Sequence, residues 1–150
     1  MKETILSKLK EEHQEIQMLL LRVDRCKGPV KKMEYYDILK KALIPHMEGE
    51  ERSLYAHLKD DVQNENANEI AGLANYEHQE IKDMLKMLDA EEIESKEWDE
   101  LFNELQENIR SHFEEEEKDL FNEAKEDFSR EELEELTREF EEAKSHSSYH

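Results

Sequence analysis

The sequence predicts an all-α protein: an up-down-up-down four-helix bundle built from two repeated helical hairpins, followed by a short fifth helix at the C-terminus. Three observations predict this fold class. The 150 residues include only three glycines and two prolines, so long helices can form. Apolar residues recur at every third or fourth position, as on the buried face of an amphipathic helix. The chain also repeats itself at an interval of about 65 residues.

The first hairpin consists of two helices that are joined at Gly28-Pro29. Its first helix should run from about Glu3 to Cys26, where Gly28-Pro29 ends it. The second helix should follow to about Asp60. Pro45 lies inside this second helix and is expected to kink it, because proline cannot donate the backbone hydrogen bond.

The second hairpin follows a polar turn. Its first helix carries an apolar stripe over residues 70–88, and its second helix begins near Trp98. Ser129 then opens the fifth helix, since Glu132 three residues later can complete a capping box. The tail over residues 145–150 is expected to be loose.

The internal repeat relates the two hairpins. The pentapeptide EHQEI occurs twice, and HMEGEERSLY aligns with HFEEEEKDLF; these segments lie at residues 12–16 and 77–81, and at 46–55 and 112–121. Two copies of a hairpin form one bundle in which neighbouring helices are antiparallel. We therefore expect a bundle domain over residues 1–128 and an additional helix with a flexible tail over residues 129–150.

The charge and cysteine content of the chain exclude several kinds of binding partner and cellular environment. Charged residues make up 41% of the chain and the formal net charge is −20, so nucleic acid and anionic membrane surfaces are not expected as partners. The single cysteine, Cys26, excludes an internal disulfide and fits a reducing compartment. The N-terminal segment is amphipathic and charged, which is typical of neither a signal peptide nor a membrane span. We expect a cytoplasmic protein.

Four histidines and two glutamates lie on the inward stripes of the four helices, with one histidine on each helix. They are His13, His46, Glu50, His78, His112 and Glu116. Each histidine is roughly 14 to 19 residues from the neighbouring turns, which corresponds to about 21–29 Å along a helix. All four can therefore meet at one level of the bundle, and each glutamate follows a histidine by one helical turn on the same face.

A cluster of this kind needs a cation. The alternative is a set of unrelated core histidines and surface glutamates, but uncompensated charges in a core cost several kcal/mol each. Six nitrogen and oxygen ligands without a thiolate exceed one tetrahedral zinc site and suit two ions of higher coordination number, with both glutamates bridging. This ligand chemistry favours iron, with manganese or zinc as other candidates.

The order of a first-helix histidine, H-x3-E-E, a second histidine and a second H-x3-E-E resembles the hemerythrin/HHE cation-binding family over about residues 1–128. The resemblance implies His13, His46, Glu50, His78, His112 and Glu116 as ligands of a di-iron centre with an oxygen bridge. Glu117 is an alternative for the second bridging carboxylate, although symmetry with Glu50 favours Glu116. Oxygen carriers of this family have H-x3-H on the third helix, where this chain has Ala74.

These features predict a non-heme di-iron protein that binds or redox-processes a small ligand, namely O2, NO or peroxide. The alternatives are an iron store, donor or sensor without catalysis, and a metal-free bundle. No redox partner is assigned.

Several other side chains are expected to pack in the core or at its rim. They are His57, Tyr55, Tyr76, Trp98, Met18, Met33, Met47, Met84 and Met87. A tyrosine near the site could also donate a hydrogen bond to a bound oxygen species.

Overall fold

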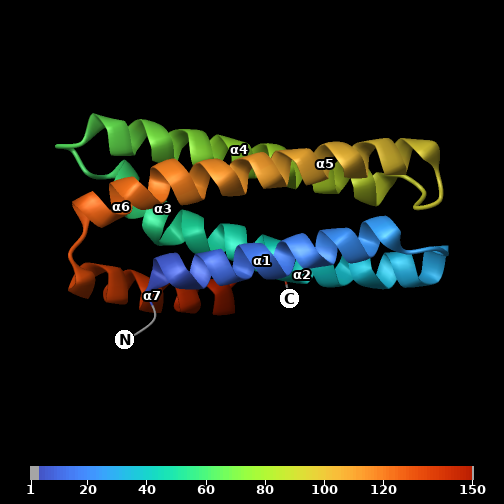
Figure 1. Ribbon diagram of the computed structural model, residues 1–150, viewed down its shortest axis with the longest axis horizontal. Helices are drawn as coiled ribbons and strands as arrows, with labels where there is room; N and C mark the ends of the chain where they lie inside the picture. Colours follow the sequence, from blue (N-terminus) through green and yellow to red (C-terminus); the bar gives the residue numbers. More distant parts are fainter. Residues whose placement is uncertain (1–3, 150) are drawn as a thin grey trace.

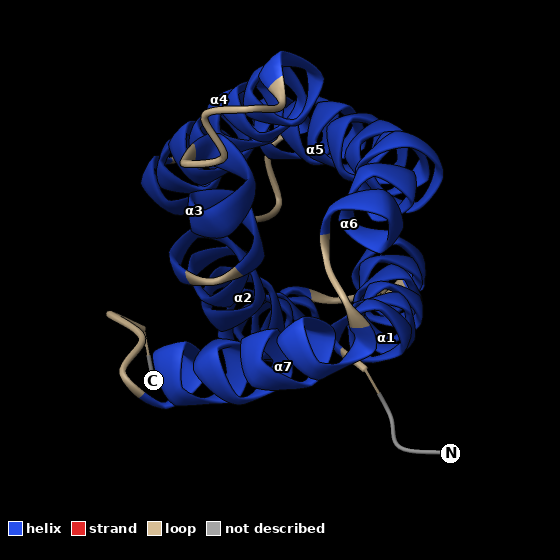
Figure 2. Ribbon diagram, turned by 90° about the vertical axis from the view of Figure 1, so that its left-hand side faces the viewer, coloured by secondary structure: helices blue, strands red, loops and turns tan. Residues whose placement is uncertain are grey.

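The computed structural model describes residues 4–149, and all regular structure within this range is helical. Four long helical segments run side by side, and a further helix at the C-terminus lies against one side of the bundle, near one end (Figures 1 and 2). The elements are α1 (Ile5–Arg25), α2 (Pro29–Arg52), α3 (Leu54–Lys59), α4 (Glu65–Ala90), α5 (Lys96–Glu115), the π-helix η1 (Glu116–Leu120), α6 (Phe121–Asp127) and α7 (Arg130–Ser145). The predicted bundle of two hairpins with a fifth C-terminal helix is confirmed.

Both hairpins have an irregularity in their second helix. The helix expected to reach Asp60 continues through Pro45 but breaks at Ser53, whose hydroxyl donates a 2.6 Å hydrogen bond to the carbonyl oxygen of Gly49. A serine bond of this type bends a helix because it competes with the backbone for the same acceptor. The equivalent place in the second hairpin is η1, a single π-helical stretch of the kind that often marks functional sites.

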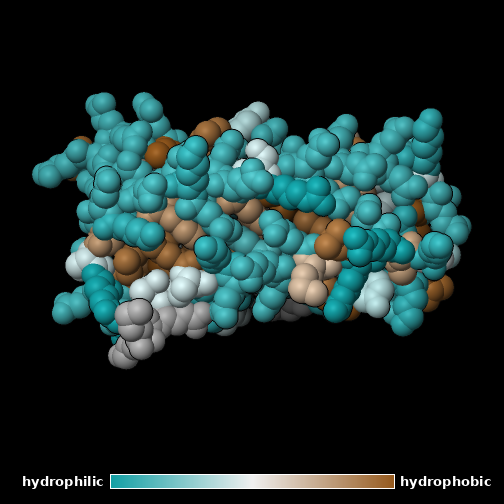
Figure 3. Space-filling view, in the orientation of Figure 1, coloured by the Kyte–Doolittle hydropathy of each residue, from teal (hydrophilic) through white to brown (hydrophobic). Residues whose placement is uncertain are grey.

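Short polar side chains cap the N-termini of three helices and so determine where these helices begin. The side chains of Asn64 and Ser95 accept hydrogen bonds from the backbone at the starts of α4 and α5, and Ser129 forms the expected capping box with Glu132. None of the helices within residues 4–149 is long and apolar enough to cross a membrane. The surface in Figure 3 is mostly hydrophilic, with scattered apolar groups, which agrees with the high proportion of charged residues.

The apolar core consists of two clusters, one on either side of the histidines. One cluster lies toward the loop between α1 and α2, and the other lies toward α7 and includes Leu9, Leu54 and Phe140. On α1 and α4 the histidine separates residues of one cluster from residues of the other, whereas after His46 and His112 the second cluster begins only in α3 and in η1–α6. The four histidines therefore share the middle level of the bundle.

Some of the expected packing is wrong. Met47 and Met84 are buried, but Met18, Met33 and Met87 are 58%, 44% and 51% exposed. Tyr76 is also exposed, because it points away from the α4 face that carries the buried residues. Their apolar character alone was a poor guide, since single apolar residues are common on protein surfaces.

The C-terminal tail is held against α2 rather than loose. Glu48 is buried, and it accepts hydrogen bonds from the hydroxyls of Ser147 and Ser148 at 3.0 and 2.7 Å. The backbone N–H of Ser148 also donates to Glu48. His150 lies outside the described residues.

Candidate metal centre

The six residues singled out from the sequence meet inside the bundle. His13 comes from α1, His46 and Glu50 from α2, His78 from α4, His112 from α5 and Glu116 from the start of η1. None of them is more than 3% exposed. The inward stripe of each helix places its histidine in the core, and the four-residue spacing places each glutamate one turn along the same face.

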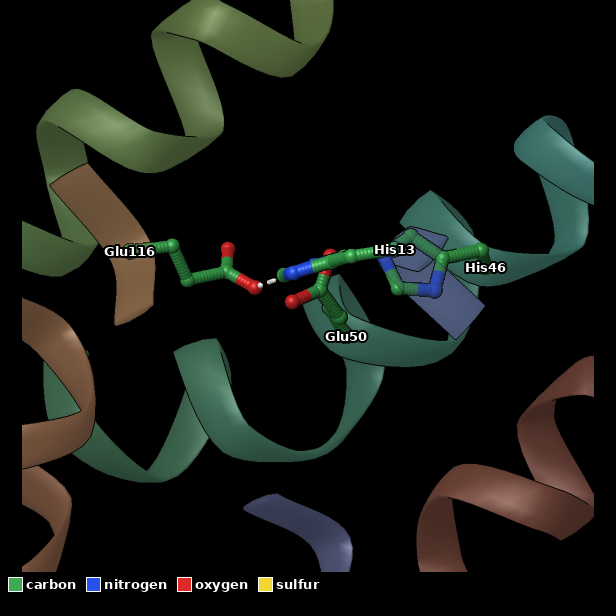
Figure 4. A group of neighbouring side chains, drawn as sticks. All are labelled: His13, His46, Glu50 and Glu116. Atoms are coloured by element: carbon green, nitrogen blue, oxygen red, sulfur yellow. Dashed lines mark ion pairs between the residues drawn. The ribbon is translucent and has the colours of Figure 1, made fainter. Parts of the chain in front are cut away.

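They form two groups that share both carboxylates. One group is His13, His46, Glu50 and Glu116 (Figure 4), and the other is Glu50, His78, His112 and Glu116. Within each group the candidate ligand atoms all lie within 4.8 Å of one another. Each group could hold a metal ion, and two such groups with two common carboxylates could hold a pair.

The carboxylates lie between the histidines of different groups. Glu50 Oε1 is 3.1 Å from His46 Nε2 and 3.4 Å from His78 Nε2. Glu116 is 3.1 Å from His13 Nε2 and 3.3 Å from His112 Nε2. Each glutamate therefore faces one histidine of each group, which is the arrangement that a bridging carboxylate needs.

Four further glutamates bind the outer nitrogens of the histidines, and the sequence reasoning did not find this role. The Nδ1 atoms of His13, His46, His78 and His112 contact Glu117, Glu12, Glu51 and Glu77 at 2.7, 2.8, 2.8 and 2.9 Å. Each carboxylate comes from the neighbouring helix that precedes its histidine's helix around the bundle. Helix α1 thus supplies the carboxylate for the histidine of α2, α2 for that of α4, α4 for that of α5, and η1 for that of α1. We call these four side chains the outer glutamates.

The outer glutamates also settle which of two neighbouring residues points inward. Glu116 is buried and belongs to both candidate metal groups, whereas Glu117 is partly exposed and faces the outer nitrogen of His13. The internal repeat contains a pattern from which the outer glutamates could have been predicted. EHQEI begins with a glutamate in both copies, and each H-x3-E-E motif ends with a second glutamate.

The outer contacts determine which atom each histidine presents to the centre. A neutral imidazole that donates Nδ1–H to a carboxylate has a lone pair on Nε2. The Nε2 lone pairs of His13 and His46 then face carboxylate oxygens, which also bear lone pairs. Six buried side-chain polar atoms in the described part of the chain lack a hydrogen-bond partner, and five of them belong to His13, His46, Glu50 and Glu116. A cation between these atoms would turn mutual repulsion into coordination, so the residues fit a metal centre.

Protons compensate part of this charge in the metal-free site. Burial, together with the neighbouring charge of Glu116, raises the pKa of Glu50 to about 8. Burial opposes the charged form of His112, but contacts with Glu116 and Glu77 outweigh it and raise the pKa of His112 to about 10. Burial likewise opposes ionisation of Glu116, yet hydrogen bonds with Glu50, His112 and His13 hold its pKa well below the ordinary value.

Tyr55 distinguishes one group from the other. Its hydroxyl is fully buried, donates to Glu116 and lies 3.3 Å from the Nε2 atoms of both His78 and His112. The aligned residue in the second hairpin is Phe121, whose ring stacks against His13 at 6.3 Å. The group containing His78 and His112 thus has a phenol beside it, where the other group has only a hydrocarbon ring.

Two other histidines lie apart from the cluster. His57 is 49% exposed, contacts Glu139 of α7 at 3.1 Å and packs edge-on against Phe128 at the rim of the core, as one of the two expected placements has it. The break at Ser53 comes between Glu50 and His57, so the stripe of α2 does not continue to it. His146 is exposed.

Comparisons with known proteins bear on the fold and the family of this chain. A crystal structure of a hemerythrin HHE cation-binding domain-containing protein from Mycobacterium kansasii superposes with a TM-score of 0.82 and 22% sequence identity, over 97% of this chain and 87% of that one. No curated protein sequence gives a significant match. The family model of the hemerythrin HHE cation-binding domain matches residues 4–124, which is most of the chain. The protein therefore belongs to the hemerythrin HHE cation-binding domain family.

Proposed function

We propose that this protein holds two metal ions, preferentially iron, and uses them to bind or redox-process a small ligand such as O2, NO or peroxide. One ion is held by His13 and His46, the other by His78 and His112, and Glu50 and Glu116 are shared. The observation that carries the proposal is the orientation of the histidines. The outer glutamates hold the rings so that the Nε2 lone pairs converge on two buried carboxylates.

The donor set supports iron. Imidazole and carboxylate without sulfur suit iron and manganese, and zinc binds such sites as well. When bound, a pair of iron ions would supply positions for a small ligand and would donate electrons to reduce it or accept electrons to oxidise it. Two carboxylates contribute less negative charge than four would, which favours ligand binding and modest redox steps over highly oxidised iron.

The chain's own residues would support this chemistry in two ways. The outer glutamates fix the ring orientations and make the imidazoles better donors. The Tyr55 hydroxyl, now donated to Glu116, is close enough to the His78–His112 position to donate to a ligand there. The burial of all six inward residues keeps bulk water from the centre.

Metal analysis after anaerobic loading with Fe²⁺ tests the proposal. We expect two iron ions per chain, with fewer in His46→Ala, whereas His57→Ala should keep the full content because His57 is an exposed residue outside both groups. One metal ion per chain after full loading would refute the two-metal proposal.

An iron store, donor or sensor is the competing function. Mixing the reduced, loaded protein with O2, NO or H2O2 in a stopped-flow spectrometer separates the two functions. Ligand-dependent absorption changes with iron retained support ligand chemistry. Release of iron without such changes would support a store or donor instead.

A further inference from the structure

The internal repeat creates two equivalent places beside the candidate metal groups, one in each hairpin. Leu9 on α1 aligns with Ala74 on α4, one turn before His13 and His78 respectively. Gly49 on α2 aligns with Glu115 on α5. The first place lies between α1 and α2, and the second lies between α4 and the α5–η1 segment.

The place in the first hairpin is filled by α7. Phe140 of this helix is fully buried in the same apolar cluster as Leu9 and lies 6.2 Å from the His46 ring. It approaches α2 so closely that a Cβ at Gly49 would lie 2.7 Å from its ring. On the inner side, Phe113 stacks on the His13 ring at 3.8 Å. Aromatic rings therefore cover the His13–His46 group.

The place in the second hairpin has no such cover within the described residues. A pocket of about 50 Å³ lies there, and Ala74, His112 and Glu116 are among the residues that line it. The smaller side chain of Ala74, compared with Leu9, contributes to this space. Because a cavity of roughly 10–15 Å³ by this measure can hold one water molecule, the pocket has room for a molecule of two or three heavy atoms.

The rim of the pocket is acidic. Glu77, Glu115 and Asp119 line it together with apolar side chains. A rim of this charge repels small anions and has little effect on uncharged molecules.

We propose that this pocket is the entry and binding site for a small uncharged ligand of two or three heavy atoms, which it delivers to the His78–His112 position and not to the His13–His46 position. The inference rests on the proposed function, and it adds the side of entry and the charge of the ligand. The fold makes the centre one-sided because α7 covers only one of two equivalent places.

Xenon tests the pocket without any metal. Crystals of the metal-free protein under xenon pressure should show xenon between α4 and α5, because xenon occupies small apolar cavities. Ala74→Leu, which copies the residue of the first hairpin, should abolish this binding. Phe140→Ala should create a second xenon site between α1 and α2. Xenon bound elsewhere in the wild-type protein, with this pocket empty, would overturn the proposal whatever the metal content.

Ligand binding tests the delivery. In stopped-flow mixing of the iron-loaded protein with NO, Ala74→Leu should slow association, because the larger side chain fills the pocket and blocks the path. Iron analysis of each variant distinguishes failure of the proposed function from failure of this inference. An unchanged NO rate in an Ala74→Leu protein with two iron ions would overturn the inference.

Azide tests the charge of the rim. The double variant Glu115→Gln/Asp119→Asn should raise the ratio of the azide rate to the NO rate roughly threefold to fivefold at low salt. The matched control is Glu114→Gln/Glu126→Gln, which removes two exposed charges from the same part of the chain outside the pocket. Equal acceleration by both double variants would show a general effect of net charge and would refute selection at the rim.

Discussion

Metal loading should release about two protons per chain near pH 7. The metal-free site holds one proton on Glu50, with a pKa of about 8, and one on His112, with a pKa of about 10. At pH 7 the first group is about 90% protonated and the second almost completely, and both must be deprotonated to bind metal. The structural cause is the burial of two carboxylates side by side, which retains protons until a metal ion replaces them.

The same protons determine how metal affinity depends on pH. Each displaced proton makes the overall association constant rise about tenfold per pH unit. The constant should therefore rise about 100-fold from pH 6 to 7, about tenfold per unit between the two pKa values, and level off above about pH 10.

The assay is a titration of metal-free protein with Zn²⁺, which avoids redox steps, in weak buffer with a pH indicator. Calorimetry in two buffers of different ionisation enthalpy gives an independent count of protons. The exposed variant His57→Ala should release the same number as the wild type. Release of less than one proton per chain at pH 7, with the site fully loaded, would refute the reasoning.

The stability of the metal-free protein should fall as pH rises, whereas its metal affinity should increase. The folded pKa values of Glu50 and His112 are both raised, so each group stabilises the fold fully only below its ordinary pKa, and this contribution is lost as pH rises through about 8 and about 10. The metal-free protein should thus melt at progressively lower temperature from pH 7 to 10. Because metal binding strengthens over the same interval, the difference in Tm between loaded and metal-free protein should widen.

Three further predictions concern single side chains. Glu12→Gln should weaken metal binding by about 10- to 100-fold, because Glu12 orients the ring of the candidate ligand His46. The control Glu11→Gln, on the exposed face of the same helix, should leave metal binding unchanged. Competition with a chelator measures both affinities. Tyr55→Phe should lower the unfolding free energy of the metal-free protein by about 1–3 kcal/mol in urea, since a buried carboxylate loses its donor; an unchanged value would show that the hydroxyl contributes nothing. Gly49→Ala should lower the unfolding free energy by about 1–3 kcal/mol, because the added methyl group crowds the Phe140 ring of α7. The control Gly72→Ala, whose methyl group meets open space, should raise the unfolding free energy by up to about 1 kcal/mol. Equal effects of the two substitutions would contradict the close approach of α7.

The sequence alone determined the bundle and the six inward residues. Helical periodicity assigns each residue to a face, and the repeat shows that both hairpins present the same groups to the centre. His13, His46, His78 and His112 could be placed at one level from the distances to the turns, because the rise of a helix is constant. The two H-x3-E-E motifs then placed one carboxylate below each of two histidines.

Other features depended on contacts between helices, which periodicity does not describe. It places Glu12 on α1 but does not show that its carboxylate reaches His46 on α2. Nor does it show that Tyr55 points inward, since the break at Ser53 resets the face of the helix that follows. The docking of α7 was equally hidden. Its capping box and apolar stripe predict a helix, but only the tertiary structure decides that Phe140 covers one of two equivalent places and leaves the other open. Local sequence determines which face of a helix is apolar, whereas the partner of that face depends on how the whole chain packs.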